Sequence, residues 1–526
     1  MDDYNIILFC CNWGPHAAFL NLQDRRADIP DEIKMVRIPC SGRITKALLF
    51  KAFEMGADGV ILLGCESGSC RYGSGTSSAL KNTTETREIL ALLGLGERRL
   101  RLENFLPHQS DELLAFLKGF VKGIRELGKS PIQAIESLWE DTREPETPEQ
   151  ILAAHDVYSC QDCGKCTSAC SLALAGKPFS PRAIASDIIA GRADTIEVRD
   201  SVNACLTCGV CYERCPSAVN FPEFIKDIRA YYRRRNMTKE PSHGGFFQSM
   251  MRAMTSENLK PRRYRELPEG IRTRKDSPVL FFGGCATYFD IFFKEYLKVK
   301  TNNIIEDSIR LLNFFDIEPN VMENERCCGH DLLWSGDRDN FIKLARLNLK
   351  AVEESGAEEL ITACPECYHT LLNEYKHYGI ELPVKITHIH EFLNKEIEKG
   401  AVSFKPLEAK VSFQDSCRQS RFNNLADLPR KLIEKFASEN MDESAARSIT
   451  NCCGNSAWTG CDGFSKAMQV QRLKQARSSG SELLLTACPK CQIHLRCAMQ
   501  DALRGDELKM EMMDLTGAIA KTIYWE

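Results

Sequence analysis

The segment Leu360-Ile-Thr-Ala-Cys-Pro-Glu-Cys367 recurs almost unchanged as Leu484-Leu-Thr-Ala-Cys-Pro-Lys-Cys491, about 125 residues further along the chain. The same interval separates a second pair of matching motifs, Arg326-Cys-Cys-Gly329 and Asn451-Cys-Cys-Gly454. Each copy also begins with a lone cysteine that follows an apolar run, Cys285 in the first and Cys417 in the second. A repeat of this length has the size of a domain. The sequence therefore predicts two duplicated domains, over residues 277–400 and 401–526.

Within each copy, short apolar runs that end at cysteine alternate with helical patterns that end at glycine. The predicted helices run from Phe341 to Gly356 and from Gln471 to Gly480. This alternation is typical of a doubly wound α/β fold, which binds ligands beyond the carboxyl ends of its strands. Thiols from several strand ends can therefore converge on one metal cluster. Each copy has one cysteine more than a cubane needs, which indicates an unusual cluster: Cys285, Cys327, Cys328, Cys364 and Cys367, and Cys417, Cys452, Cys453, Cys488 and Cys491.

The N-terminal region, residues 1–140, shows the same alternation. Three apolar runs end at cysteine, with a predicted helix from Ile44 to Gly56: Ile6–Phe9 before Cys10 and Cys11, Met35–Pro39 before Cys40, and Val60–Gly64 before Cys65. Because consecutive strand ends meet at one edge of a parallel sheet, these thiols are expected to cluster there. Inert buried cysteines are the alternative interpretation.

Between these regions lies a third predicted domain, residues 141–239, followed by a linker over 240–276. It contains two C-x2-C-x2-C-x3-C motifs, formed by Cys160, Cys163, Cys166 and Cys170, and by Cys205, Cys208, Cys211 and Cys215. In this spacing three thiolates bind one 4Fe–4S cubane and the fourth binds the other cubane of the pair. The predicted ligand sets are Cys160, Cys163, Cys166 and Cys215, and Cys205, Cys208, Cys211 and Cys170. A zinc site is the alternative, although zinc usually takes two separated pairs of ligands.

The composition limits the classes of protein that this chain can belong to. Its 526 residues include 25 cysteines, with 68 basic and 72 acidic side chains and a hydrophobic fraction of 43%. Wholesale disorder and a bulk nucleic-acid partner are therefore excluded. The acidic N-terminus argues against export, and no apolar stretch is long enough to span a membrane, so we expect a cytoplasmic protein. In a reducing compartment so many thiols favour metal ligands over a disulfide framework.

These motifs resemble those of known proteins. The duplicated units resemble the CCG domains of the heterodisulfide reductase B subunit, or the matching half of its fused D subunit. The paired-cubane region resembles the C subunit, and the order is that of the fused form. The first 130 residues resemble the delta subunit of methyl-viologen-reducing hydrogenase in these motifs: Cys11-Asn-Trp13, Pro39-Cys-Ser-Gly42, Gly56-Ala-Asp-Gly-Val60, Gly64-Cys65 and Cys70-Arg-Tyr72.

The resemblance implies an α/β N-terminal iron–sulfur domain, an α-helical bacterial-type ferredoxin domain with two 4Fe–4S cubanes, and two duplicated α/β CCG domains. Each CCG domain would hold one non-cubane 4Fe–4S cluster on its five cysteines, and these ten cysteines would be the catalytic residues. The N-terminal domain would hold one 2Fe–2S cluster on Cys11, Cys40, Cys65 and Cys70, with Cys10 as an alternative ligand.

The chain departs from the resembled families at a few positions. Gly14 stands where the delta subunit has the second cysteine of its Cys-Asn-Trp-Cys pattern. Gln414-Asp-Ser-Cys417 replaces the usual His-Asp-Pro-Cys, and Cys453-Gly-Asn455 lacks the common glycine run. Cys11, Cys40, Cys65 and Cys70 still suffice for a 2Fe–2S cluster. The two changes in the second duplicated unit leave its cluster ligands in place and alter the region where a substrate would bind.

The resemblance implies an oxidoreductase subunit of an electron-bifurcating complex that reduces a disulfide or a similar two-electron acceptor. Electrons would enter at the N-terminal domain, pass to a flavin subunit resembling heterodisulfide reductase A, and return through the cubanes to the CCG domains. A hydrogenase- or formate-dehydrogenase-like partner would donate them. FAD is expected only on the partner, because this sequence has no phosphate loop or dinucleotide fingerprint. The alternatives are a subunit of a quinone-linked oxidoreductase and a non-catalytic electron carrier.

Several other residues have both functional and structural interpretations. His330, His369 and His494 lie beside cluster cysteines and could deliver protons to a leaving thiolate, although such histidines are more often packing residues. The basic runs Tyr231–Arg235 and Lys260–Arg265 could bind a partner or an anion, but a solvated face is favoured. Cys461 and Cys497 fit no ligand pattern and are predicted to be free thiols.

Overall fold

The computed structural model describes residues 4–132, 146–264, 267–400, 402–439, 447 and 450–525. They divide into two compact units. The first unit is drawn from Met1–Glu140 and His243–Arg263, and the second from Asp141–Ser242 and Tyr264–Glu526. None of the helices in the described parts of the chain is both long and apolar enough to cross a membrane.

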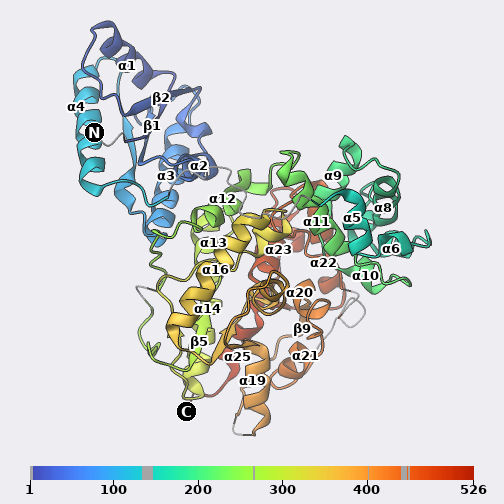
Figure 1. The fold of residues 1–526 in the computed structure, drawn as a ribbon. Helices are drawn as coiled ribbons and strands as arrows, with labels where there is room; N and C mark the ends of the chain where they lie inside the picture. The colour runs from blue at the N-terminus through green and yellow to red at the C-terminus, as the bar shows by residue number, and fades with distance from the viewer. Residues whose placement is uncertain are drawn as a thin grey trace. The chain divides into compact units, whose positions relative to one another are not determined.

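The first unit is built on a parallel four-stranded sheet with the strand order β2-β1-β3-β4. Its strands and helices are β1 (Ile6–Cys11), α1 (Gly14–Asp24), β2 (Ile33–Ile38), α2 (Lys46–Glu54), β3 (Gly59–Gly64), α3 (Gly75–Leu92), β4 (Leu100–Asn104) and α4 (Ser110–Leu127). Helices α1 and α4 pack together over one face of the sheet (Figure 1). Helices α2 and α3 also pack against each other. This is the α/β domain that the cysteine-terminated runs predict.

The segment His243–Arg263 belongs to this first unit, although it falls within the predicted linker. It contains helix α12 (Phe246–Ala253), whose apolar side chains are buried and which packs against α2. Glu54 of α2 accepts hydrogen bonds from the Arg252 guanidinium, at 2.5 Å, and from the Ser249 hydroxyl. The apolar run Phe246–Met254 forms this helix because it finds an apolar surface to cover.

In the second unit, the described residues of 146–242 form helices and no strand. The helices are α5 (Pro148–Ala154), α6 (Lys165–Ala169), α7 (Ser171–Leu174), α8 (Pro181–Ile189), α9 (Ile196–Ala204), α10 (Val210–Glu213) and α11 (Phe221–Arg234). They group together in Figure 1 around an apolar core that includes Val202, Phe224 and Ile228. The same core contains the buried cysteines Cys452 and Cys488 of the second duplicated copy.

The two duplicated copies form two further parallel sheets, with the strand orders β6-β5-β7-β8 and β11-β10-β9. The first copy contains β5 (Val279–Phe282), α13 (Ala286–Phe293), α14 (Asn302–Phe314), β6 (Asn320–Val321), α15 (His330–Trp334), α16 (Arg338–Ser355), β7 (Glu359–Thr362), α17 (Pro365–His369), α18 (Tyr375–His377), β8 (Lys385–His388) and α19 (Ile389–Glu398). The second contains β9 (Val411–Gln414), α20 (Cys417–Ser420), α21 (Leu428–Ile433), α22 (Gly463–Ser478), β10 (Leu483–Thr486), α23 (Pro489–Met499), α24 (Gly505–Leu508), β11 (Glu511–Asp514) and α25 (Leu515–Thr522). The repeat in the sequence is therefore a repeat in the fold.

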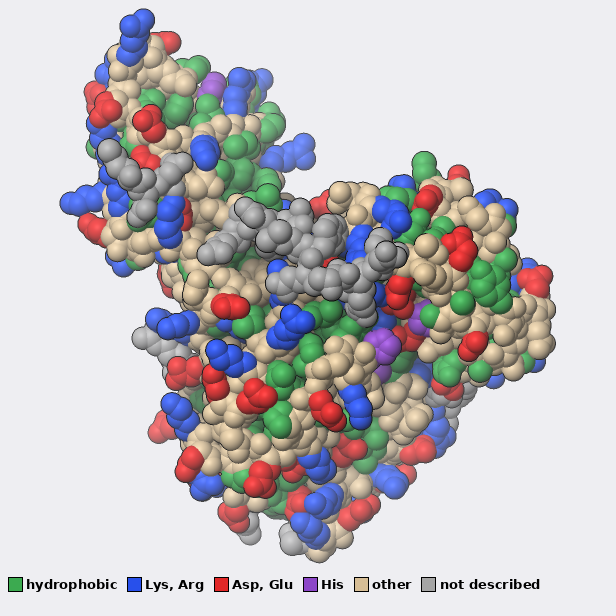
Figure 2. Space-filling view, viewed as in Figure 1, with side chains coloured by type: hydrophobic (Ala, Val, Ile, Leu, Met, Phe, Trp, Pro, Cys, Tyr) green, Lys and Arg blue, Asp and Glu red, His purple; other side chains and the backbone are tan. Residues whose placement is uncertain are grey.

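The two copies share one hydrophobic core, which runs from Phe281 and Ile309 in the first to Leu485 and Ile519 in the second. Helix α14 packs against α25, and α19 packs against α21. The copies are thus two halves of one body. On the face shown in Figure 2, lysine and arginine side chains are interspersed with aspartate and glutamate, in keeping with the balanced composition.

Helix ends follow local signals, and the observed bounds differ from the predicted ones by two or three residues for α2 and the start of α16, and by more at the start of α22. Helix α16 ends at the predicted glycine, Gly356, which has a φ of 65°. Helix α22 begins eight residues before the predicted start at Gln471, at Gly463, because the Asp462 carboxylate accepts hydrogen bonds from the backbone N–H groups of Phe464 and Ser465. The apolar periodicity alone did not reveal this cap.

Candidate iron–sulfur sites

Four thiols gather at the carboxyl edge of the first unit's sheet. The Cys11 and Cys65 sulfurs lie 3.7 Å apart, and the thiols of Cys40 and Cys70 interact with each other. Gly75 starts α3 so close to the last pair that a Cβ there would lie 2.6 Å from the Cys40 sulfur and 2.7 Å from that of Cys70. These four thiols are the predicted N-terminal ligand set.

Two neighbouring positions, Cys10 and Gly14, do not contribute a thiol to this set of four. Successive side chains of a strand point to opposite faces. Cys10 accordingly lies in the apolar core with Leu8 and Leu63, and burial raises the pKa of its thiol to about 12. At Gly14 a Cβ would lie 2.8 Å from the Phe105 carbonyl oxygen, so a cysteine would require the backbone to shift.

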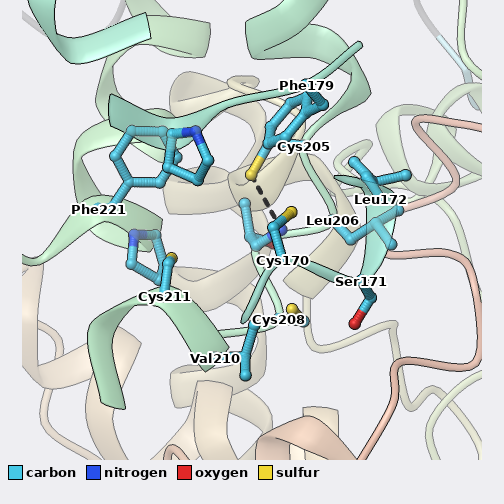
Figure 3. Close-up of a pocket in the computed structure, with 13 residues that line it drawn as sticks. Cys170, Ser171, Leu172, Phe179, Cys205, Leu206, Cys208, Val210, Cys211 and Phe221 are labelled. Atoms are coloured by element: carbon cyan, nitrogen blue, oxygen red, sulfur yellow. Dashed lines mark hydrogen bonds between the residues drawn. The ribbon is translucent and has the colours of Figure 1, made fainter. Parts of the chain in front are cut away.

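The helical region carries the two C-x2-C-x2-C-x3-C motifs. Cys170, Cys205, Cys208 and Cys211 are buried and line one pocket together with Leu172, Phe179, Leu206, Val210 and Phe221 (Figure 3). Cys170 thus lies among the cysteines of the second motif, as the spacing predicts. The other four lie nearer to solvent: Cys160, Cys166 and Cys215 are partly buried and Cys163 is exposed.

Each duplicated copy gathers its cysteines at one place, and in the second copy Cys417 lies near Cys453. In the first copy, Cys285 lies 3.0 Å from Cys327, Cys328 contacts both Cys327 and Cys367, and Cys367 contacts Cys364. In the second copy, Cys453 contacts both Cys452 and Cys491, and Cys491 contacts Cys488. The thiol contacts lower the pKa of Cys453 to about 5.

The second copy's cysteines also touch the helical region. The Cys208 thiol interacts with that of Cys452, and this contact together with burial raises the pKa of Cys208 well above its ordinary value. The neighbouring hydroxyls of Thr207 and Ser456 are hydrogen-bonded at 3.0 Å. The second C-x2-C motif and the second copy therefore meet at one place.

Three buried arginines hold the loop that carries Cys205 and Cys208. Each donates hydrogen bonds to carbonyl oxygens of this loop: Arg229 to Cys205 at 2.5 Å, Arg418 to Thr207 at 3.0 Å, and Arg421 to Cys208 at 2.6 Å. Arg229 also donates to the Trp334 carbonyl at 2.7 Å, and the Arg418 guanidinium lies 3.8 Å from the Trp334 ring. The loop is therefore hydrogen-bonded to the second copy, and Arg229 of α11 links it to Trp334 of the first copy.

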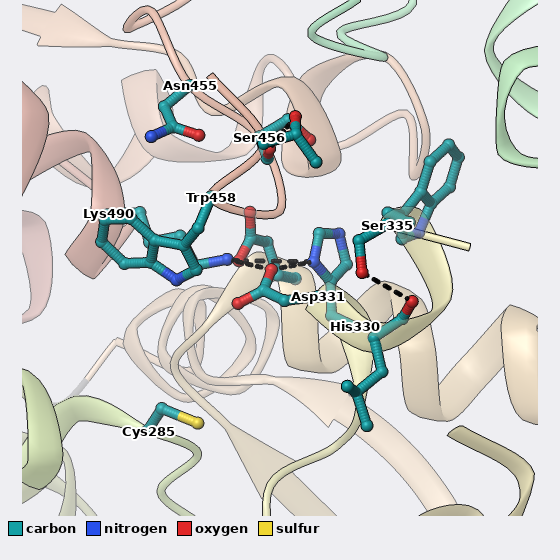
Figure 4. Close-up of polar contacts among 12 residues, drawn as sticks. Cys285, His330, Asp331, Ser335, Asn455, Ser456, Trp458 and Lys490 are labelled. Atoms are coloured by element: carbon teal, nitrogen blue, oxygen red, sulfur yellow. Dashed lines mark hydrogen bonds and ion pairs between the residues drawn. The ribbon is translucent and has the colours of Figure 1, made fainter. Parts of the chain in front are cut away.

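A buried ion pair joins the two copies between their cysteine sets. Glu366 and Lys490 occupy the same position of the repeated Cys-Pro-x-Cys motif, and their Oε2 and Nζ atoms lie 2.6 Å apart. Lys490 also contacts the carboxylate of Asp331, as Figure 4 shows. The side chains of Lys490, Glu366 and Asp331 are only 6%, 11% and 3% exposed. At this position of the repeat, the two copies therefore carry side chains of opposite charge.

The three histidines have different surroundings. His330 places Nδ1 2.9 Å from Asp331 Oδ1 and accepts a hydrogen bond from Arg418 Nε at Nε2. His369 lies by Asn423 and Glu374. His494 Nδ1 lies 3.4 Å from the Cys453 sulfur, so this histidine contacts a thiol of a predicted cluster site directly.

The remaining candidates lie outside the thiol clusters. Cys461 is exposed, and Lys466 Nζ is 3.2 Å from the Cys497 sulfur. In the basic run after Tyr231, Arg233 pairs with Asp337 at 3.1 Å. The other run ends at Arg265, which lies outside the described residues. Sequence reasoning missed Arg229, Arg418 and Lys490; only Lys490 had a signal, the lysine that replaces Glu366 in the repeat.

Comparison with protein families matches three kinds of domain. Residues 6–128 match "Methyl-viologen-reducing hydrogenase, delta subunit", residues 159–220 match a 4Fe-4S dicluster domain, and residues 279–372 and 411–496 each match a Cysteine-rich domain, CCG. The chain is a fusion of these domains. The predicted resemblance is confirmed, in the predicted order, and the helical region of the fusion is its dicluster domain.

Individual proteins similar to this chain support this domain assignment. The fusion chain is 23% identical to the D subunit of dihydromethanophenazine:CoB–CoM heterodisulfide reductase from Methanosarcina barkeri, over 66% of this chain and 83% of the relative. The B subunit of fumarate reductase (CoM/CoB) from Methanothermobacter marburgensis is 24% identical, over 70% and 73%. The EtfAB:quinone oxidoreductase of Syntrophomonas wolfei is 24% identical, over 64% of this chain and 54% of the relative. The fusion is thus homologous to reductase subunits.

The residues present fit iron–sulfur clusters. The thiols are free, and all of the predicted ligands except Cys163 are buried or partly buried. Backbone N–H groups point at sulfur, from Thr207 to Cys205 and from Gly329 to Cys327, each at 3.4 Å. Such hydrogen bonds to sulfur tune bound clusters. The apolar lining of the dicluster pocket suits a group that is kept from water.

Proposed function

We propose that the chain is the electron-transferring and catalytic subunit of a heterodisulfide-reductase-like complex. It reduces a disulfide, or a similar two-electron acceptor, at its two CCG domains. The observation that carries this proposal is the contact between Cys208 and Cys452, because it joins the dicluster domain to a CCG domain through buried thiols. Electrons pass between redox sites only when the sites lie close together. Packed residues between the two sites keep water away from them.

The ligand sets are those that the spacing and the resemblance predict. Cys11, Cys40, Cys65 and Cys70 would hold a 2Fe–2S cluster. Two 4Fe–4S cubanes would be held by Cys160, Cys163, Cys166 and Cys215 and by Cys170, Cys205, Cys208 and Cys211. The ten CCG cysteines would hold two non-cubane 4Fe–4S clusters. Bound clusters of these kinds supply one-electron transfer over a wide range of potentials.

The protein's own residues would orient and tune these sites. Arg229, Arg418 and Arg421 fix the loop that carries Cys205 and Cys208, and their buried positive charge favours the more negative, reduced state of whatever that loop binds. The Glu366–Lys490 pair holds the two CCG domains in register, so that a substrate can face both cysteine sets. Asp331 and His330 complete this polar junction.

The N-terminal domain extends the proposal to electron bifurcation. Its relatives in sequence are hydrogenase delta subunits, and we propose that it exchanges electrons with a flavin-bearing partner resembling heterodisulfide reductase A. A hydrogenase- or formate-dehydrogenase-like donor would supply the complex, which we place in the cytoplasm. The test is anaerobic native purification from the source cells, followed by measurement of bound flavin. Co-purification with a flavoprotein and such a donor is expected.

A quinone-linked role is the second candidate, because the EtfAB:quinone oxidoreductase is among the relatives. Recovery in the membrane fraction alone, with quinone-reactive partners and without flavoprotein, would contradict the bifurcation proposal and favour this role. Reduction of a soluble quinone analogue by the purified chain would then be the next assay.

Substitution of Gly75 tests the N-terminal ligand set. Gly75→Ala introduces a methyl group against the Cys40 and Cys70 sulfurs, so we expect the purified protein to lose about two iron atoms per chain, the content of a 2Fe–2S cluster. Iron analysis and the absorption spectrum check this. Gly119→Ala in α4 is the control, because no heavy atom lies within 4 Å of a Cβ there. Equal iron content in both variants would contradict this ligand assignment.

A further inference from the structure

Two cysteines of the second CCG domain remain once every predicted cluster ligand is assigned, and both lie on segments that lead away from the cluster site. Cys461 lies in the loop that follows Cys453, immediately before the residue that caps α22. Cys497 lies on α23, the helix that also carries Cys491. Because α22 packs against α23, these two segments lie beside each other.

Lys466 connects the two cysteines. It lies near the start of α22, where its backbone N–H donates to the Asp462 carbonyl oxygen at 3.1 Å. Its ammonium group donates to the Cys497 carbonyl oxygen at 2.8 Å and lies 3.2 Å from the Cys497 sulfur. Cys461 directly precedes Asp462, and Cys497 and Lys466 both lie near enough to act on its thiol. The two thiols therefore share one ammonium group.

The two thiols have different surroundings, which give them different roles in an exchange reaction. A thiolate is the nucleophilic form of cysteine, and an adjacent ammonium group stabilises its negative charge. Cys497 has such a group at hydrogen-bond distance. Partial desolvation and the neighbouring Cys497 raise the pKa of Cys461, so this thiol stays protonated near neutral pH. Cys497 is therefore the attacking thiol, and Cys461 acts second.

Both thiols can be reached from solvent. Cys461 is exposed and Cys497 is partly buried, whereas four predicted ligands of the same domain are buried: Cys452, Cys453, Cys488 and Cys491. A reagent in solvent therefore reaches this pair more readily than those ligands. In reducing compartments, disulfides that do form are transient and catalytic or redox-sensing. An accessible pair beside an ammonium group suits that kind of chemistry.

We infer that Cys461 and Cys497 form a thiol–disulfide exchange site that takes low-molecular-weight disulfides and closes an internal disulfide. In the first step, the Cys497 thiolate attacks one sulfur of the small disulfide, forms a mixed disulfide and releases one small thiolate. In the second step, the Cys461 thiol loses its proton to solvent, attacks the Cys497 sulfur and releases the other small thiolate. Two protein thiols are thereby oxidised to one disulfide, and one small disulfide is reduced to two thiols.

The internal disulfide joins the loop that follows Cys452 and Cys453 to the helix that carries Cys491. These segments carry predicted ligands of one cluster site, so the exchange site is a redox-sensitive link beside that cluster. The inference goes beyond the proposed function and does not depend on it, because the exchange needs neither a cluster nor an electron donor.

Anaerobic incubation of the full chain, with its clusters, in excess glutathione disulfide tests this inference. After free thiols are alkylated, trypsin releases residues 497–504 as a peptide with one cysteine. We expect mass spectrometry to find this peptide bonded to the peptide over 448–466, and fragmentation to place the bond at Cys461. The iron content should stay unchanged, because no cluster ligand takes part.

Four variants separate the two steps. Cys461→Ser is expected to stop the reaction at the mixed disulfide, with glutathione retained on Cys497, and Cys497→Ser should prevent both steps. Lys466→Met should slow the first step about two- to fivefold, the effect expected of a partly exposed charge. Lys474→Met, at an exposed position of the same helix, is the control and should leave the rate unchanged.

Three outcomes would overturn the inference. Glutathione disulfide could leave residues 497–504 of the unmodified chain unreacted, Cys461→Ser could cross-link as fully as the unmodified chain, or Lys466→Met could react as fast as Lys474→Met. None of these outcomes bears on the proposed function, because reduction at the CCG domains uses other cysteines. Conversely, loss of disulfide reduction at those domains would leave the exchange site standing.

Discussion

Cys491→Ser is expected to lower disulfide reduction by more than about 100-fold, a larger loss than is usual for residues that only support metal ligands. A serine hydroxyl stays protonated near neutral pH and does not replace a thiolate ligand. The substitution removes a thiol that contacts both Cys453 and Cys488. The assay follows the disulfide-dependent oxidation of a reduced viologen by anaerobic protein, and the dicluster signals in electron paramagnetic resonance should persist.

The chain offers a matched control in the same domain. Cys461→Ser replaces an exposed cysteine outside the thiol clusters and should leave the activity unchanged. Cys367→Ser makes the equivalent change in the first CCG domain and should cause a loss as large as that of Cys491→Ser. If Cys491→Ser kept most of the activity, reduction would not take place at the second CCG domain, and the catalytic assignment would be wrong.

Lys490→Met is expected to destabilise the junction of the CCG domains by about 3–5 kcal/mol, the usual cost of leaving buried charges unpaired. Lys490 is the ammonium between Glu366 and Asp331, and all three side chains are nearly inaccessible to water. Methionine keeps most of the side-chain volume and removes the charge. Hydrogen–deuterium exchange of peptides from β7 and β10 measures the free energy of local opening.

An ion pair nearer the surface, between strands β7 and β8 of the first copy, serves as the comparison. Lys385 and Glu359 lie 2.7 Å apart, with side chains 67% and 27% exposed. Exposed pairs contribute less than about 1 kcal/mol, so Lys385→Met should change the exchange of the same peptides only slightly. Equal effects of Lys385→Met and Lys490→Met would show that the buried pair does not hold the junction together.

Much of the fold could be predicted from the repeat in the sequence. Cysteine-terminated runs predicted the parallel sheets, because a strand end and its thiol are local features that recur at a fixed interval. The neighbourhood of Cys170 and Cys205 could likewise be predicted from spacing, since one short motif fixes which cysteine reaches the other set. The helix over Phe246–Ala253 was not predicted, because its apolar residues show no clear period and the surface of α2 that they cover is distant in the sequence.

The surroundings of the sites depend on contacts between distant segments. Arg418 and Thr207 are far apart in the sequence, and no local pattern marks Arg418 as the donor to that loop. The opposite charges of Glu366 and Lys490 are visible in the repeat, but their meaning requires that the two copies face each other.

The central claim is that the CCG domains are where a disulfide is reduced, and electron paramagnetic resonance of the oxidised protein tests it most directly. On addition of 3-mercaptopropionate, we predict a new paramagnetic signal in the unmodified chain and in Cys461→Ser, and its loss in Cys367→Ser and Cys491→Ser. If the thiol produced no new signal in the unmodified chain, its sulfur would not reach these sites. The CCG domains would then only carry electrons to another protein.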